Sequence, residues 1–478
     1  MTYYLKRNTI KKYRRSIITI NDFSRGIVTD KDSFLLPFNQ ATLAYNFNFL
    51  SGVLKDGFGI KECDLYQGSS PKFELTNQPK KLYYYKRFDK QINRYIDYLL
   101  VYCADGYIYK NIIGNNLEFE KIDELYFTSA PESVSYTYQG QDVIIFSTTS
   151  ELKIYDGSYI TVVEDCPSVT SICIHNERLF ATEGGEKTSL WFSDDFDPTN
   201  WAVSLDEAGY IDLRDGRGSL IKVLSFGGYV YVFRNYGITR VTAYGNQAEF
   251  SVDGISSTSG KIYGNSITHC GDKIIYLAKD GFYSFTGGKP TKILERLEGV
   301  LSEIDNEDAK GAYFNGKYYC CFKIKSDEDT FEKVLLCYDI KSGDFTIARG
   351  LNLIDFCAME AEKRCELLFI CEGKDVIGTL SSKAQFFGES LQKVWRSGKS
   401  DLGVIKDKCL TKVYVNTLSP LKIRVKSEKE SRTLHFLGST SNQMQLASVR
   451  GDIFEIELIC DTPNCKINNI ALEYEYGR

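Results

Sequence analysis

Several residue types and sequence features are scarce in this chain of 478 residues. It has nine prolines and three each of histidine, methionine and tryptophan. No window approaches the roughly 20 apolar residues that a membrane-spanning helix needs. The basic N-terminal stretch is followed only by residues 16–20 before Asn21 and Asp22, which is too short for the hydrophobic part of a secretory signal. We therefore expect a protein that is made in a cytoplasm and does not enter a membrane.

Missing motifs argue against catalysis and against a bound metal. The sequence has no G-x-S-x-G elbow, no Walker loop and no dinucleotide-binding fingerprint. Of the three histidines, His175 and His269 precede equivalent turns of an internal repeat, and His435 lies in a polar stretch. There is no CxxC pair, although zinc sites need closely spaced ligands. The sequence predicts no enzyme activity, no cofactor and no metal.

The 14 cysteines lie mostly within apolar runs that resemble strands, such as residues 318–322 and 335–338. Without an export signal, buried reduced thiols that pack as small hydrophobic groups explain them best. Cys460 and Cys465 are the pair to examine first for a disulfide. We expect the chain to fold with all its thiols reduced.

Charge is nearly balanced, with a net value of −5, which argues against a surface devoted to gripping nucleic acid. The exception is a basic N-terminal arm. Such a run can be a solvated arm, or it can order on an acidic partner or on DNA phosphates. Its basic residues are Lys6, Arg7, Lys11, Lys12, Arg14 and Arg15.

Aromatic residues and glycine, in contrast, are plentiful. The chain contains 33 tyrosines, 29 phenylalanines and 38 glycines. Aromatic side chains favour the pleated surface of a sheet, and glycine supplies the turns between strands. This composition predicts an all-β protein.

An internal repeat extends from about residue 81 to residue 380. Its clearest copy, 266–293, alternates four apolar segments with glycine turns. The first inner turn of successive copies falls near residues 140, 176, 227, 271, 316 and 363, so the spacing is 36 to 51 residues. Four short strands in 40 to 50 residues are typical of a propeller blade, because one such sheet must bury both faces against its neighbours.

The fold that we predict is a six- or seven-bladed β-propeller with a small C-terminal β-sandwich. Residues 1–80 would form an N-terminal arm and a strand that closes the propeller, with 53–60 as that strand. Residues 81–390 would form the propeller, and residues 391–478 the sandwich. An eight-stranded sandwich is the alternative, but the repeat has too many copies for it. Residues 41–49 and 294–305 are the best candidates for short helices.

One local motif, residues 193–201 with the sequence SDDFDPTNW, resembles a degenerate Asp-box. This is the Ser-x-Asp-x-Gly-x-Thr-Trp turn between outer strands of some propellers, sialidases among them. Ser193, Asp195, Thr199 and Trp201 match it loosely, whereas Asp197 replaces the glycine. Because the box is a folding device, we expect Trp201 to be buried and Asp195 to lie near turn amides.

Three regions resemble phage virion propeller proteins, in particular the packaged-DNA stabilisation or tail-hub (nozzle) proteins of short-tailed phages. The first region runs from Phe23–Gly26 through Asn46 to residues 51–57. The second is the middle stretch 210–244. The third is the C-terminal stretch 450–478.

The resemblance implies a structural protein of the head-to-tail connector or tail, located in the virion. Its copies would form a ring below the portal and its adaptor, next to tail proteins. We expect six copies in this ring. This ring would extend the channel for packaged double-stranded DNA and retain the genome. Two alternatives from other classes are a receptor- or glycan-binding propeller and a glycan-active enzyme built on a propeller.

Overall fold

Strands dominate the computed structural model, which describes residues 13–63, 75, 77–114, 119–148, 151–185, 187–204, 208–258, 260–301, 304–325, 330–362 and 364–477. Its contacts divide the chain into two units. Unit 1 contains residues 1–59, 344–350 and 381–478, and unit 2 contains residues 60–343 and 351–380. Within the described ranges, no helix has the length and apolar character to cross a membrane.

Antiparallel sheets of four strands follow one another along unit 2, each with its strands in chain order. The first sheet contains β6 (Pro79–Asp89), β7 (Arg94–Cys103), β8 (Tyr107–Ile112) and β9 (Glu120–Tyr126). The second contains β10 (Glu132–Tyr138), β11 (Gln141–Ser147), β12 (Leu152–Tyr155) and β13 (Ile160–Val163). The third contains β14 (Val169–His175), β15 (Arg178–Glu183), β16 (Ser189–Phe192) and β17 (Gly209–Asp212).

The next three sheets repeat this order. The fourth contains β18 (Leu220–Phe226), β19 (Tyr229–Arg234), β20 (Gly237–Thr242) and β21 (Ser251–Ser257). The fifth contains β22 (Thr268–His269), β23 (Ile274–Ala278), β24 (Gly281–Phe285) and β25 (Thr291–Ile293). The sixth contains β26 (Lys310–Phe314), β27 (Lys317–Lys325), β28 (Phe331–Asp339) and β29 (Phe345–Arg349), and its last strand, β29, is counted with unit 1 by its contacts.

The last sheet is completed by a strand from the N-terminal part of the chain. β30 (Leu353–Ala361), β31 (Arg364–Cys371) and β32 (Gly378–Ser381) are followed by β5 (Gly59–Glu62), with the hairpin β33 (Gln385–Phe386) and β34 (Glu389–Ser390) at its end. The sequence predicted an N-terminal closing strand over 53–60, and the structure places that strand at Gly59–Glu62. Leu54–Asp56 forms β4, which belongs to a sheet of unit 1.

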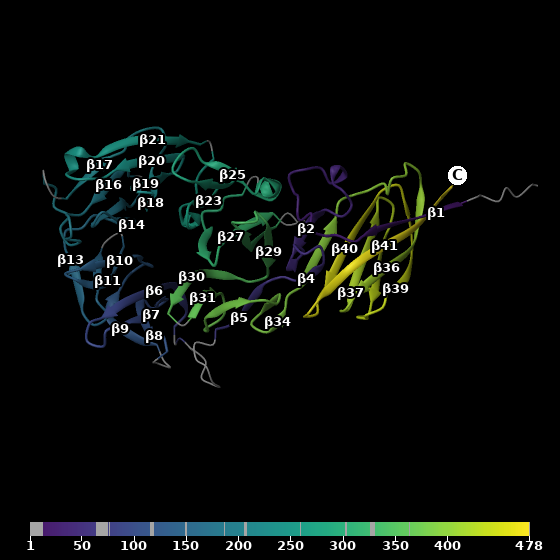
Figure 1. Ribbon diagram of the computed structural model, residues 1–478, viewed down its shortest axis with the longest axis horizontal. Helices are drawn as coiled ribbons and strands as arrows, with labels where there is room; N and C mark the ends of the chain where they lie inside the picture. The colour runs from purple at the N-terminus through teal and green to yellow at the C-terminus, as the bar shows by residue number, and fades with distance from the viewer. Residues whose placement is uncertain are drawn as a thin grey trace, which may run out of the picture. The chain divides into compact units, whose positions relative to one another are not determined.

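The sheets of unit 2 follow one another around a ring (Figure 1). First strands of neighbouring sheets contact each other, as β10 does with β14, β14 with β18, and β30 with β6. This radial arrangement is a β-propeller. Segments 143–146, 230–233, 274–277 and 318–322 lie in β11, β19, β23 and β27, each the second strand of its own sheet. The sequence prediction that these four segments occupy equivalent positions is confirmed.

Turn chemistry and packing explain why the repeat folds this way. Gly140, Gly271 and Gly316, in the turns between first and second strands, have φ values of +71°, +72° and +74°, which only glycine adopts without strain. In the described part of the propeller, core clusters draw on two neighbouring sheets. Tyr85 of the first sheet and Tyr155 of the second are both buried, with ring centroids 6.4 Å apart.

Unit 1 is a sandwich of two sheets built from both ends of the chain. One sheet has the order β3–β4–β41–β36–β39, with β1 also paired to β41, and the other has the order β2–β35–β40–β37–β38. The N-terminal strands are β1 (Tyr13–Ile20), β2 (Ala41–Tyr45), β3 (Phe47–Asn48) and β4 (Leu54–Asp56). The C-terminal strands are β35 (Lys393–Ser397), β36 (Lys408–Thr417), β37 (Leu421–Ser427), β38 (Ser431–Phe436), β39 (Gln443–Gly451), β40 (Phe454–Cys460) and β41 (Lys466–Gly477).

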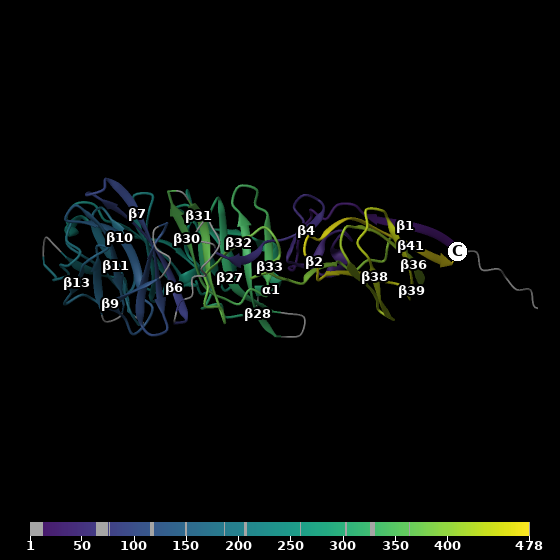
Figure 2. The same cartoon turned by 90° about the horizontal axis from the view of Figure 1, so that it is seen from below.

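The pairing of β1 with β41 joins the two ends of the chain over eight residues, from Tyr13 opposite Gly477 to Ile20 opposite Ile470. The two strands lie side by side in both views (Figures 1 and 2). The sequence interpretation built the sandwich from residues 391–478 alone. In the structure, four N-terminal strands also belong to its sheets.

Helix is rare in the described part of the chain. Residues 41–49 were expected to be helical, but they form β2 and β3, because Ala41 and Ala44 pair with β35 and pack inward. Residues 294–305 contain the 3-10 turn η4 (Glu295–Leu297) and the short helix α1 (Glu298–Leu301). The other 3-10 turns are η1 (Ser33–Leu35), η2 (Gln247–Glu249) and η3 (Gly264–Ser266).

Candidate functional site

The Asp-box-like segment connects β16 to β17, the two outer strands of the third sheet. Trp201 is 3% exposed and packs in a cluster with residues of the second and third sheets, including Val143 and Leu179. Its indole Nε1 donates to the Pro198 carbonyl at 3.0 Å. The Ser193 hydroxyl accepts from the Leu179 amide, also at 3.0 Å. The predicted burial of Trp201 is confirmed.

Asp195, expected near the turn amides, instead forms an ion pair with the buried Arg178, with 3.0 Å between Oδ1 and Nε. The turn amides are bonded by its neighbours. Asp194 accepts from the Asp195 amide at 2.7 Å, and Asp197 accepts from the amide of Thr199 at 2.9 Å and from its hydroxyl at 2.6 Å. The prediction for Asp195 was wrong because Asp197, which replaces the glycine of the box, performs that capping role.

A pocket of about 840 Å³ opens where the inner turns of the second, third and fourth sheets meet. Phe196, at the tip of the Asp-box-like loop, lines it and is 68% exposed. This phenylalanine has a φ of +57°, a left-handed conformation that costs free energy in a residue with a side chain. An exposed aromatic ring held in a strained loop beside a pocket is suited to contact with a ligand.

The polar wall of the pocket is fixed by hydrogen bonds. His175 is 6% exposed, and its Nδ1 lies 2.8 Å from the Ser225 hydroxyl. Because the Asn176 amide group donates to Nε2 at 3.2 Å, Nδ1 carries the proton and donates to Ser225. Burial lowers the pKa of His175, in agreement with a neutral ring. Both ring nitrogens are bonded, so His175 is not available as a general base in this arrangement.

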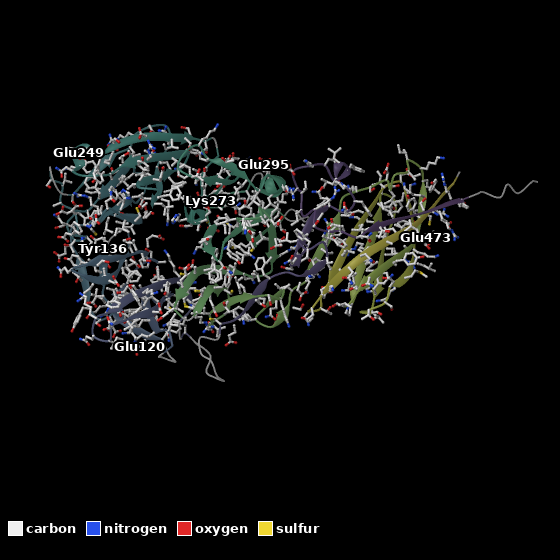
Figure 3. All side chains as sticks on the ribbon, viewed as in Figure 1. Glu120, Tyr136, Glu249, Lys273, Glu295 and Glu473 are labelled. Atoms are coloured by element: carbon white, nitrogen blue, oxygen red, sulfur yellow. The ribbon has the colours of Figure 1, made fainter. Side chains whose placement is uncertain are left out.

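Tyr136 (labelled in Figure 3) also lines the pocket, from the inner strand β10. Its hydroxyl donates to the Glu177 carbonyl at 2.6 Å, and burial with the nearby Asp197 carboxylate raises its pKa to about 12. Among the described residues that line the pocket there is no lysine or arginine, and Glu177 is the one carboxylate. The pocket wall thus presents amide, hydroxyl and aromatic groups that can bind a polar ligand.

A second polar cluster lies where the inner strands of three sheets converge. The Glu132 carboxylate of the second sheet accepts from Lys81 of the first at 2.5 Å and from Lys222 of the fourth at 3.3 Å. Partial burial by itself would raise the pKa of Glu132. The two ammonium groups outweigh that effect and hold this pKa at about 2. The carboxylate is therefore charged under physiological conditions.

Asp355 performs a similar joining role in the last sheet. It is buried, and its carboxylate accepts from Lys310 of the sixth sheet and from the Leu82 amide of the first, both at 2.8 Å. Lys81 and Asp355 each follow a β-bulge of their inner strand. These ion pairs tie the inner strands of different sheets to one another.

In unit 1, Asn46 is a hub of hydrogen bonds. It is 3% exposed, and its side-chain amide donates to the carbonyls of Gln392 at 2.7 Å and Arg349 at 3.2 Å. Its Oδ1 accepts from the Arg349 amide at 2.9 Å, and its backbone is bonded to Ile347 and to Gly57. A Cβ on Gly57 would come within 2.8 Å of the Asn46 backbone, so this position requires glycine.

We expect Asn46→Ala to lower the free energy of unfolding of unit 1 by about 2 to 4 kcal/mol, because it removes three hydrogen bonds from a buried side chain to partly buried backbone groups. Asn46 also has a φ of +60°, which alanine adopts poorly. Asn46→Gly separates the two effects, since glycine tolerates this backbone but cannot restore the hydrogen bonds. Urea unfolding measures both variants. The exposed Asn48→Ala serves as the control, and an equal loss there would contradict the role of Asn46.

Other residues of the N-terminal resemblance also form the framework of unit 1. The Phe23 ring is fully buried and meets the buried Trp395 edge-on at 5.2 Å between centroids. The Phe23 amide donates to the Gly52 carbonyl at 3.1 Å, and Leu54 is fully buried. The sequence progression from 23 to 57 is therefore a structural signature of this sandwich.

Two of the basic arm residues lie in the described part of the chain. Arg14 and Arg15 are exposed on β1, and Arg15 Nε lies 2.5 Å from Glu475 of β41. The last two residues of the predicted arm, Arg14 and Arg15, therefore belong to β1 and pair with β41. The remaining members, outside the described residues, are Lys6, Arg7, Lys11 and Lys12.

Within the ranges that the structure describes, no group of three or more His, Cys, Asp or Glu side chains could hold a metal ion. The radial sheets define the chain as an all-β protein with a β-propeller and a β-sandwich. No family model matches the sequence, and no curated protein matches it.

Solved structures give three examples of similar folds. BBS1N, crystallised in complex with ARL6DN, has a TM-score of 0.42 at 9% identity, over 67% of this chain and 96% of that chain. The Neurospora crassa Pan2 WD40 domain has a TM-score of 0.36 at 8% identity, over 64% and 89%. Kluyveromyces lactis Hsv2 has a TM-score of 0.32 at 10% identity, over 53% and 82%. The fold assignment rests on the sheets themselves.

Proposed function

We propose that this chain is a structural virion protein of the phage head-to-tail connector or tail. Its copies form a ring, six by expectation, that extends the DNA channel and retains the packaged genome. The role is mechanical and involves no catalysis. Its partners are further copies of the chain, the portal or its adaptor, tail proteins and the DNA that passes through.

The observation that carries this proposal is the partition of charge between the two units. Unit 1 has 25 Lys and Arg residues against 16 Asp and Glu residues, a net charge of +9. Unit 2 has 33 against 47, a net charge of −14. The nearly neutral chain therefore divides into a basic unit 1 and an acidic unit 2.

Opposite charges on two bodies of one chain favour association of unlike surfaces. A ring needs heterologous contacts, in which one surface of each copy meets a different surface of the next. Complementary charge steers such contacts and suppresses the like-with-like alternatives. The basic sandwich of one copy is thus suited to meet the acidic propeller of the next copy.

The ion pairs between inner strands bear on where DNA would pass. Lys81, Glu132 and Lys222 come from three sheets and meet within hydrogen-bond distance, so these inner strands converge on one polar cluster. In this proposal the DNA channel is the space enclosed by the ring of copies. An acidic propeller beside that channel would not hold the phosphates, because tight non-specific binding requires cationic contacts.

The arm supplies a test of docking. Removing residues 1–15 would cut into β1, so the matched deletion is residues 1–12, which retains Tyr13 opposite Gly477. We expect this deletion to leave the unfolding midpoint unchanged and to weaken association with the portal–adaptor complex by tenfold or more at low salt. The difference should shrink as salt rises, since screening shortens the reach of charge.

A second variant keeps the full length of the arm but removes its charge. In it, alanine replaces Lys6, Arg7, Lys11 and Lys12. It should reproduce the effect of the deletion in the same binding assay. Full association by both variants at every ionic strength would end the docking role of the arm.

A second candidate, favoured by the pocket with Phe196 and Tyr136, is binding of a receptor or surface glycan. Here Phe196 would stack on a sugar ring while amide side chains of the wall bond its hydroxyls. A glycan-array signal that Phe196→Ala removes would favour this candidate over the virion ring. The same signal unchanged in Phe196→Ala would place binding elsewhere.

A further inference from the structure

Cys460 and Cys465 lie at the point where the chain crosses between the two sheets of unit 1. Cys460 is the last residue of β40, in one sheet, and Cys465 immediately precedes β41, in the other. Both side chains are buried, with exposures of 0% and 3%. All 14 cysteines, these two included, are free thiols in the structure.

Each of the two side chains is the largest influence on the pKa of the other. The Cys460 thiol also lies 3.6 Å from the Thr462 carbonyl and 3.5 Å from its hydroxyl. Four residues separate the two cysteines in sequence. The short crossover therefore brings the two cysteines to the same cluster of polar groups, since Cys460 contacts Thr462 and the Cys465 amide donates to Asp56.

A buried cation lies beside this pair. The Lys393 side chain is 0% exposed, and its Nζ donates to the carbonyls of Thr462 at 2.8 Å and Leu391 at 3.2 Å. Its charge is shared with Asp56, whose carboxylate lies 3.4 Å away and accepts from the Cys465 amide at 3.0 Å. The crossover is thus fixed by an ion pair whose cation favours a negative charge on a nearby sulfur.

The electrostatics of this pair differ from those of the other buried cysteines. The hydrogen bond from Cys465 lowers the pKa of Cys460 to about 6 against the opposing effect of burial, and Lys393 contributes in the same direction. Burial instead raises the pKa of Cys270 and of Cys371 to about 12. A thiolate is the nucleophile in disulfide exchange, so Cys460 is the cysteine of this group that is prepared to react.

We propose that Cys460 and Cys465 form an oxidisable dithiol site, which small-molecule disulfides convert to a bond between the two sheets of unit 1. The Cys460 thiolate attacks one sulfur of glutathione disulfide, and the other sulfur leaves as a glutathione thiolate. The Cys465 thiolate then attacks the Cys460 sulfur and expels the second glutathione. The protein loses two hydrogens in total, and one disulfide becomes two thiols.

This site is independent of the proposed virion role. The chain folds with reduced thiols in a cytoplasm, and the bond closes when the folded protein meets an oxidising medium. A closed bond would fasten the crossover of the sandwich after folding is complete. Most of the other twelve cysteines are buried, and burial raises the pKa of thiols such as Cys103 and Cys173 to about 12, which leaves them protonated and unreactive.

The test treats the folded full-length chain with glutathione disulfide, denatures it under acid quench and counts thiols with a mass-tagged maleimide. We expect the count to fall from 14 to twelve, with a mass loss of about 2 Da and a 460–465 cross-link in the peptide map. Cys460→Ser and Cys465→Ser should each abolish closure. The Cys371→Ser control should lose two thiols like the parent chain.

Three results would overturn the proposal. One is a count of 14 free thiols after treatment that fully oxidises the denatured chain. Another is loss of thiols from cysteines outside the pair, with 460 and 465 still labelled. The third is a stable glutathione adduct on Cys460 that Cys465 does not resolve. Because these readings are taken on the parent chain, they do not depend on the folding of a variant.

Discussion

Replacing Trp201 with alanine is expected to lower the free energy of unfolding by about 3 to 5 kcal/mol, the usual range for a large aromatic side chain removed from a core. The indole is 3% exposed and packs between the second and third sheets of the propeller. Alanine would leave a cavity there and also leave the Pro198 carbonyl without its indole donor. Urea unfolding followed by circular dichroism measures the change.

Phe196→Ala is the matched control, because it removes a large aromatic ring from the same loop. That ring is 68% exposed, so its loss should change the free energy of unfolding by less than about 1 kcal/mol. Equal destabilisation by both variants would mean that the loop, and not the buried indole, carries the effect.

Glu132→Gln is expected to cost about 3 kcal/mol of stability at pH 7. The two lysines hold the pKa of Glu132 at about 2, against about 4.5 in the unfolded chain, and that difference corresponds to about 3 kcal/mol. Glutamine keeps the shape of the side chain but leaves Lys81 and Lys222 without a countercharge. The loss therefore appears as a lower unfolding midpoint of the propeller.

The pH dependence has a definite sign. A carboxylate whose pKa is depressed on folding contributes its stability above its unfolded pKa, and loses it as pH falls through its folded pKa. The difference in unfolding free energy between the parent chain and Glu132→Gln should thus be constant above about pH 5 and vanish near pH 2. The exposed Glu120 (Figure 3), changed to Gln, should show less than about 1 kcal/mol at any pH. If the difference in unfolding free energy between the parent chain and Glu132→Gln became larger as pH falls, the lowered pKa of Glu132 would be contradicted.

The repeated four-strand sheets of the propeller could be predicted from the sequence, because each turn and strand is specified by residues close together in the chain. Turns such as Gln139–Gly140 and Asn315–Gly316 have positive φ values, which asparagine and glycine in particular tolerate, and each precedes a buried apolar strand. These signals recur at a regular spacing. They located the second strand of four sheets correctly.

Unit 1 could not be read in the same way, because its pairings join distant parts of the chain. β1 and β41 are separated by more than 440 residues, and neither carries a local signal for the other. The stretch 41–49 has residues that suit a helix, but burial of Ala41 and Ala44 against β35 decides in favour of a strand. Tertiary pairing overrides local propensity here.

The candidate sites were predicted in part. The burial of Trp201 followed from the Asp-box-like pattern, but the partner of Asp195 is Arg178, and the motif does not include that residue. The meeting of Glu132 with Lys222, 90 residues later, depends on how the sheets are arranged around the ring. A polar residue near the start of successive inner strands is the one sequence signal that could have indicated this cluster.

The most direct test of the central claim is the number of copies of this chain in purified phage particles, measured by mass spectrometry against isotope-labelled standard peptides. Portal peptides in the same sample provide the internal reference. A ring below the portal predicts a fixed number of copies per particle, six by expectation, that survives removal of loosely bound protein by high salt. Particles that are infectious and contain none of this chain would contradict the claim.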